Sequence, residues 1–324
     1  MRARSRTLRW PTPALRATPA VINHNQIPAY TLDPVKRDPA PAPAERSHTP
    51  NFINDIAAGR VELPTIPRVV HQVVAVLRDP NADARRIGDA LSRDPVLSAK
   101  VLRLANSSFF AGQRSVASIE AAVVLIGTQG LNRLIVASGI SASFKAIPGI
   151  DLPAFWRDSL MAATAAHRLA PRLGADAEEA YVCGLLHATG HLILCHAYPE
   201  IADAMFTGFA LLRGAELAAI EIECFGIDHP TAGALWVDTL GFPQSVAGTI
   251  RHALQAPAAT DKPLDLSLRG ACALTAAVAR QDAVEAAAGA LPANVRSGCV
   301  RTDGQPDAAF VKLYEMLRET QPVI

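Results

Sequence analysis

The chain has 324 residues, of which 50% are hydrophobic, 5% aromatic and 19% charged, which fits a globular, helix-rich protein with a substantial core. The 31 basic and 30 acidic side chains give a formal charge of +1, so no net field attracts nucleic acid or an anionic membrane. The apolar runs fall far short of the roughly 20 residues that span a bilayer, and five cysteines without a C-x-x-C pair favour a reducing cytoplasm over a disulfide framework.

Proline and arginine dominate the start of the chain. Nine of the 24 prolines lie before residue 51, and the alternating prolines at 39, 41 and 43 exclude a helix or a central strand. Five arginines and no acidic residue fall within the first 24 positions, without the apolar segment of a secretory signal. We therefore expect residues 1–55 to be a disordered arm, either a solvated basic tail or a tether.

Helical periodicity begins after Pro64. Apolar residues recur along one helical face from Ile66 to Leu77, and a second helix is predicted at 83–92. Asp94, followed by Pro95, supplies an N-cap for a third helix, and Ser118 supplies one for a fourth. Residues 127–130, which begin and end with glycine, are expected to end that fourth helix.

The same periodicity continues to about residue 255. The further predicted helices are 131–144, 152–170, 177–186, 192–196, 201–209, 216–224, 230–240 and 245–253. No segment alternates with the period of two that a strand requires. The prediction is therefore an all-α domain over residues 56–255.

A stretch rich in alanine and proline, 255–263, interrupts the helical pattern. Beyond it, 268–290 and 307–317 are predicted to be helices. We therefore expect residues 256–324 to form a short C-terminal helical extension.

Histidines are the candidates for a chemical site. His187 and His191 lie four residues apart, a spacing that places two imidazoles on one face of a helix, as in metal-binding helices. Gly190 lies between them, and a helix break there would separate the two rings. His229 lies at a predicted helix start and His252 at a predicted helix end. From spacing alone, each is either a hydrogen-bonded core residue or a ligand.

Several motifs follow one another in a recognisable order. They are 63–67 (LPTIP), 92–107 (SRDPVLSAKVLRLANS), 118–127 (SIEAAVVLIG), 156–160 (WRDSL), 184–190 (GLLHATG), 198–200 (YPE) and 221–243. Together they resemble the HDOD family, the HD-related output domain of bacterial signalling proteins, over about residues 60–254. The resemblance implies an all-helical fold related to HD-type metal-dependent phosphohydrolases, and a regulatory role without demonstrated catalysis.

The departures from the HD pattern imply a degenerate site. An HD phosphohydrolase uses a helix histidine, a His-Asp pair and a later aspartate to hold the cations that activate water. Here the pair reads His187-Ala188, Asp158 stands where the first histidine is expected, and Arg251-His252 keeps one member of a common His-His pair. The pocket candidates are Asp158, His187, His191, His229, Arg251 and His252. The candidate metal ligands among them are Asp158, His187, His229 and His252.

Three uses of this pocket remain open. It is a structural polar core, a site for one weakly bound divalent metal without turnover, or a site for a small anion such as a nucleotide held by Arg251. The chain contains neither a P-loop nor a G-x-G-x-x-G motif for phosphate.

The preferred functional hypothesis is a non-catalytic regulatory protein that binds signalling proteins, with no membrane partner. A stripe of alanines in 162–166 packs either inside the domain or in a homodimer. The second hypothesis is a phosphohydrolase with a residual mononuclear site, to which Asp203 or Asp228 would contribute the missing carboxylate.

A third hypothesis is DNA binding through residues 84–106, drawn as a helix-turn-helix. Ser98, Lys100 and Arg103 would lie on its second helix. The net charge of +2 over residues 81–110 is modest for a DNA reader, so the sequence favours packing over nucleic-acid contact.

Overall fold

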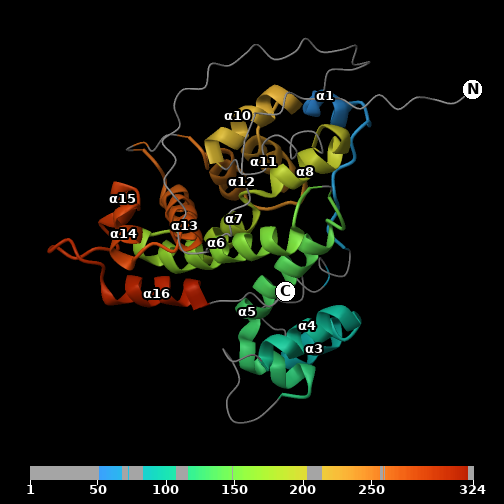
Figure 1. The fold of residues 1–324 in the computed structure, drawn as a ribbon. Coiled ribbons are helices and arrows are strands. Elements are labelled where there is room, and N and C mark those ends of the chain that lie inside the picture. Colours follow the sequence, from blue (N-terminus) through green and yellow to red (C-terminus); the bar gives the residue numbers. More distant parts are fainter. Residues whose placement is uncertain are drawn as a thin grey trace, which may run out of the picture. The chain divides into compact units, whose positions relative to one another are not determined.

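The computed structural model describes residues 51–67, 72, 83–106, 116–147, 149–202, 214–255, 258 and 260–319. The regular elements of these ranges are α-helices, beside one isolated antiparallel bridge between Val300 and Pro306 (Figure 1). In chain order the described helices are α1 (Phe52–Ala57), α3 (Ala84–Leu91), α4 (Pro95–Ala105), α5 (Ile119–Ala142), α6 (Leu152–Leu173), α7 (Ala177–Leu186), α8 (Thr189–Ala197), α10 (Gly214–Phe225), α11 (His229–Thr239), α12 (Gln244–Arg251), α13 (Pro263–Ala279), α14 (Val284–Gly289), α15 (Ala293–Arg296) and α16 (Ala308–Glu319). The predicted all-α class is confirmed.

Local capping signals place several helix starts correctly. The Asp94 carboxylate accepts hydrogen bonds from the backbone N–H groups of Val96 and Leu97, and Pro95 occupies the first helical position of α4. The Ser118 hydroxyl likewise accepts from Ala121 at the start of α5. These side chains satisfy backbone donors that have no partner within the helix, so the boundaries are encoded locally.

Some boundaries differ from the prediction. Helix α1 begins at Phe52, inside the range expected to be an arm, and the predicted helix 268–290 is two helices, α13 and α14. The predicted break within 127–130 is present at Gly127, which adopts φ 76°, a value that glycine tolerates, and α5 consists of two helical segments on either side of this kink. Residues 1–50, most of the predicted helices 66–77 and 201–209, and Asp203 lie outside the described residues.

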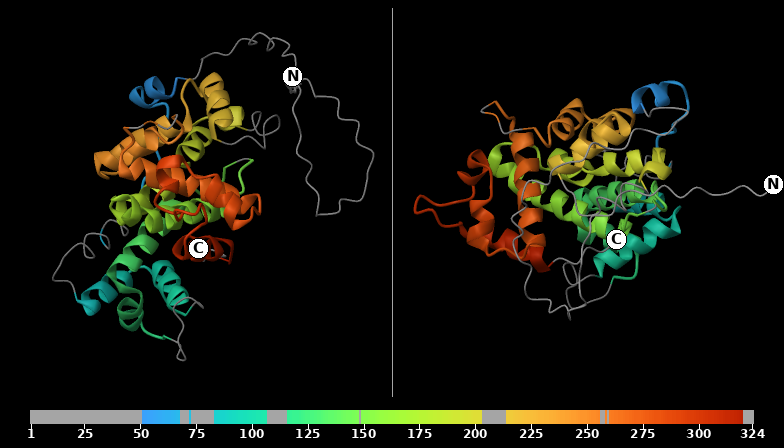
Figure 2. Two further views of the ribbon diagram at one scale, coloured as in Figure 1. Left: turned by 90° about the vertical axis from the view of Figure 1, so that its left-hand side faces the viewer. Right: turned by 45° about the horizontal axis from the view of Figure 1, so that its top comes forward.

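The buried apolar side chains form two clusters. A small cluster joins α3, α4 and α5, and a larger one joins the second half of α5 with α6, α7, α8, α11, α12 and α13 (Figures 1 and 2). Buried residues of α14, α15 and α16 belong to the larger cluster as well. Consequently the helices of the predicted C-terminal extension share one core with the preceding domain, and the described residues from 51 onward belong to one compact unit.

Helices α6 and α7 pack unusually close together. All four alanines of the predicted stripe, Ala162, Ala163, Ala165 and Ala166, are buried. A Cβ atom added at Gly184 in α7 would lie 2.6 Å from the backbone oxygen of Ala162. The alanine stripe therefore serves packing inside the protein.

Two helical stretches, 119–142 and 177–197, are long and apolar enough by composition to cross a membrane. Polar and charged residues interrupt the apolar runs of both stretches. Half of the apolar window of the first stretch and 72% of that of the second are buried inside the protein. Their apolar character matches their places in the two clusters.

Candidate functional site

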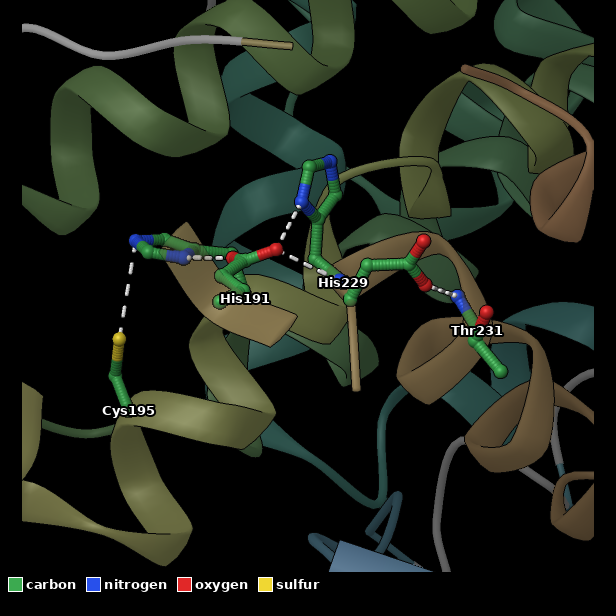
Figure 3. A network of polar contacts seen from close by, with 6 residues as sticks. His191, Cys195, His229 and Thr231 are labelled. Atoms are coloured by element: carbon green, nitrogen blue, oxygen red, sulfur yellow. Dashed lines mark hydrogen bonds and ion pairs between the residues drawn. The ribbon is translucent and has the colours of Figure 1, made fainter. Parts of the chain in front are cut away.

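A buried carboxylate joins two of the predicted histidines (Figure 3). Glu221 in α10 is 0% exposed. Its Oε1 lies 2.6 Å from His191 Nδ1, and its Oε2 lies 2.6 Å from His229 Nδ1 and 2.8 Å from the His229 backbone nitrogen. Because an ionised carboxylate only accepts hydrogen bonds, both Nδ1 atoms are donors. Three donors therefore satisfy one buried negative charge.

The electrostatics of the network follow from these bonds. Burial alone would raise the pKa of Glu221, because it disfavours the charged form. The hydrogen bonds from His191 and His229, together with the electrostatic interaction of Glu221 with both rings, outweigh burial and hold the pKa of Glu221 below its ordinary value. Glu221 is therefore a carboxylate inside the protein at neutral pH.

A close contact between α8 and α11 brings the two rings together. A Cβ atom added at Gly190 would lie 1.9 Å from the backbone oxygen of His229 and 2.6 Å from the backbone nitrogen of Gly233. The absence of a side chain at Gly190 thus lets the two helix starts touch. Asp228 accepts a hydrogen bond from the Thr231 backbone at 3.0 Å and so caps α11 directly before His229.

His187 is not part of this network. Helix α7 ends at Leu186 and α8 begins at Thr189, so His187 lies in the turn between the two helices and His191 lies in α8. The Nδ1 atom of His187 lies 2.8 Å from the backbone oxygen of Gly184. Its pKa is raised to about 9, because the charges of Cys272 in α13 and of Asp158 and the bond to Gly184 together outweigh burial. Of the two arrangements left open by the sequence, the structure shows the helix break.

The remaining predicted residues lie near the surface. Asp158 has a side chain that is 57% exposed and lies 3.4 Å from Arg157, although its charge still raises the pKa of His187. Arg251 is exposed and pairs with Asp238 at 3.7 Å. His252 is exposed at the end of α12. The structure thus joins His191 with His229 and leaves Arg251 and His252 outside their network.

The HD-type metal centre requires carboxylates that these positions lack. Ala188 carries no ligand atom, and Asp158 points to solvent beside Arg157. One carboxylate often orients a metal-ligating histidine, but Glu221 bonds two rings whose Nε2 atoms point in different directions (Figure 3). Within the described ranges, no group of three or more His, Cys, Asp or Glu side chains is arranged to hold a metal ion. The residues present do not fit this centre.

The segment drawn as a helix-turn-helix has the expected helices, α3 and α4. Its second helix turns a key polar group inward: the Ser98 hydroxyl donates to the backbone oxygen of Leu91 at 3.1 Å. Burial and the neighbouring Arg103 lower the pKa of Lys100. Ser98 therefore serves the packing of α4 on α3.

Glu221 carries the charge of the site but was not among the predicted residues. A signal for Glu221 exists, because it falls on the buried face of α10 with Ala218 and Phe225, spaced by three and four residues. A carboxylate at a core position demands partners.

The comparisons with known proteins agree with this architecture. The family model for the HDOD domain matches residues 63–256, which is more than half of the chain. The chain belongs to the HDOD family.

Three similar proteins have different descriptions. A crystal structure from Shewanella amazonensis SB2B, provisionally named a phosphohydrolase, is 28% identical with a TM-score of 0.64 and covers 82% of this chain and 93% of its own. An HDOD domain protein of unknown function from Geobacter sulfurreducens is 23% identical with a TM-score of 0.61, over 82% of this chain and 96% of its own. An uncharacterized protein from Treponema pallidum (strain Nichols) is 25% identical over 68% of this chain, which spans only 43% of that relative's length.

Proposed function

We propose that the protein is a non-catalytic regulatory protein of the bacterial cytoplasm, which transmits a signal by binding other signalling proteins. The observation that carries this proposal is the Glu221 network, in which one buried carboxylate accepts hydrogen bonds from both His191 and His229. This arrangement stabilises the contact of α8, α10 and α11. The two histidines thus have a structural role instead of binding a metal ion.

The replacement of the HD carboxylate supports the same proposal. Ala188 follows His187 where the enzyme pattern has an aspartate, and no ligand atom replaces it at that position. A domain without turnover can pass on a signal only through contacts with other molecules. One similarly folded protein, from Marinobacter aquaeolei VT8, is provisionally named a signal transduction protein.

A metal-dependent phosphohydrolase is the second candidate. The Shewanella amazonensis structure with that provisional name is 28% identical, and the charge of Asp158 reaches His187. A single metal between these two side chains would be the remnant of the HD centre. This candidate makes a distinct experimental prediction.

The test is the metal content of the purified, untagged protein, measured by elemental mass spectrometry after reconstitution with iron, manganese or zinc. It is combined with hydrolysis of bis(p-nitrophenyl) phosphate. We expect no stoichiometric metal, and turnover no greater than that of His187→Ala. Stoichiometric metal and turnover that both disappear in His187→Ala, but survive in the exposed control His196→Ala, would overturn the proposal in favour of the hydrolase.

A further inference from the structure

Three polar side chains meet where α5 contacts α6 and α7, and the proposed regulatory role does not use them. Arg133 of α5 donates through Nη1 to Glu178 Oε1 of α7 at 2.6 Å, and the same Nη1 lies 3.0 Å from His167 Nε2 of α6. His167 Nε2 is also 3.3 Å from Glu178 Oε1. The three side chains are between 24% and 32% exposed, so protons from the solvent reach this Arg133 cluster.

The hydrogen bonds define the protonation state of His167. A guanidinium can only donate, so His167 Nε2 accepts from Arg133 and the neutral ring carries its proton on Nδ1. Burial and the charges of Arg133 and Arg168 lower the pKa of His167, and they outweigh the opposite effect of Glu178. His167 is therefore neutral at neutral pH.

The surroundings of His167 make it the proton-sensitive member of the cluster. The Tyr181 ring of α7 meets the His167 ring edge-on, with centroids 6.4 Å apart, and Arg133 Cζ lies 5.8 Å from the Tyr181 centroid. Burial raises the pKa of Tyr181 to about 12, so its hydroxyl stays protonated. Helices α13 and α16 also pack on α6, but the largest charges that act on His167 come from α5, α6 and α7. Histidine is the side chain whose charge ordinarily changes between pH 5 and 8.

The cluster lies at a junction of the fold. Leu131 and Ile135, on either side of Arg133 in α5, belong to the small apolar cluster, whereas Val136 and Ile140 belong to the larger one. The partners of Arg133 are on α6 and α7, two helices of the larger cluster. The polar contact therefore holds α5 where this helix passes from one apolar cluster to the other.

We propose that His167 is a proton-operated switch on the contact of α5 with α6 and α7. A protonated ring points an N–H group at Arg133 Nη1, only 3.0 Å away, so the two cations repel each other. The new Nε2–H group donates instead to Glu178 Oε1, the oxygen that Arg133 uses at neutral pH. Arg133 thus loses one acceptor and competes for the other. Acid weakens the contact of α5, which makes proton concentration an input signal of this protein.

The titration of His167 tests the first step. It is followed in the full-length protein by NMR of isotope-labelled histidines, and the His167 signal is assigned with His167→Gln or His167→Asn. We expect its midpoint to lie below that of the histidines in the urea-unfolded chain. Arg133→Gln should raise the midpoint, because it removes the nearest positive charge. Arg301→Gln, at a side chain that is 64% exposed, is the matched control and should leave the midpoint unchanged.

Hydrogen exchange of residues 131–142, corrected for the intrinsic effect of pH on amide exchange, tests the structural consequence. In the wild type this part of α5 should exchange about tenfold faster at about pH 5.5 than at neutral pH, the effect of losing one hydrogen bond to a charged group. Glutamine offers Arg133 a neutral acceptor, so His167→Gln should match the wild type at neutral pH and lose the response to acid. His196→Gln, at an exposed histidine of α8, should keep the response.

Several outcomes contradict the switch. An acid response that persists in folded His167→Gln would overturn it, and so would a His167 midpoint at or above that of the unfolded chain. If His167→Gln does not fold, the wild-type exchange and the Arg133→Gln titration decide, and a pH-independent exchange or an unchanged midpoint overturns the proposal. No partner takes part in these measurements, so their result is separate from the test of the regulatory role.

Discussion

Glu221 shows how one residue can organise three segments of the chain. Its carboxylate meets an imidazole from α8 and both the imidazole and the backbone N–H at the start of α11. Hydrogen bonds to a charged group contribute more than neutral ones, and an unpaired buried charge is costly. The network is therefore strong only when it is complete.

Glu221→Gln should lower the free energy of unfolding by about 2–3 kcal/mol. The amide nitrogen donates rather than accepts, so it opposes either His191 or His229 while the side-chain volume stays the same. Urea denaturation measures the loss. Glu223→Gln, an exposed substitution on the same helix, should change the stability by less than about 0.5 kcal/mol.

Lowering the pH should remove the stability that the ionised Glu221 carboxylate contributes. The folded pKa of Glu221 is depressed, so its contribution to stability is complete above the ordinary value of about 4.3 and is lost as pH falls through the lower folded value. The wild type should therefore lose more stability than Glu221→Gln between about pH 4.3 and the acid limit. Equal losses in the two proteins would show that Glu221 is not held ionised.

At the scale of elements, the sequence predicts what neighbouring residues determine and misses what depends on residues far apart in the chain. The caps at Asp94 and Ser118 and the bounds of α7 follow from neighbouring residues, and the structure confirms them. The partners of His191 do not, because Glu221 is 30 positions away. Likewise, no local pattern reveals the close approach of Gly190 to the backbone of His229 in α11.

The close approach of Gly190 to α11 predicts that substitution by alanine has opposite effects on stability at Gly190 and at Gly248. Gly190→Ala should destabilise the protein by about 1–3 kcal/mol or more, because the new methyl group would collide with the His229 backbone and force α8 from α11. Gly248→Ala in α12 meets nothing within 4 Å and should stabilise by about 0.5–1 kcal/mol. Thermal and urea unfolding of both variants measures the contrast, and a tolerated Gly190→Ala would refute the close approach.

At the scale of the whole molecule, the C-terminal helices are part of the core rather than an appendage. Helix α13 packs on both α6 and α7, and a Cβ atom at Gly270 would lie 2.9 Å from the side chains of Leu169 and Val295. The sequence predicted a boundary before a short helical extension because the Ala- and Pro-rich stretch 255–263 interrupts the helical pattern. Composition marks a break in helical pattern, but it does not report what the next helix covers.

A chain that ends at residue 255 should therefore lose cooperative unfolding and bind a hydrophobic dye, since it exposes the faces of α6 and α7 that α13 covers. Leu268→Ala in the full chain removes part of the same contact and is the smaller change. Because Leu268 is 1% exposed, this substitution should lower the free energy of unfolding by about 2–5 kcal/mol. Circular dichroism melts and dye fluorescence test both. A truncated chain that melts cooperatively at the full-length midpoint would make α13 dispensable.

Helix α5 contributes buried side chains to both apolar clusters. After the kink at Gly127, Leu131 and Ile135 belong to the small cluster, and Val136 and Ile140 belong to the large one, within a rod about 20 Å long. The two clusters are therefore joined by the continuous backbone hydrogen bonds of one helix rather than by a loop.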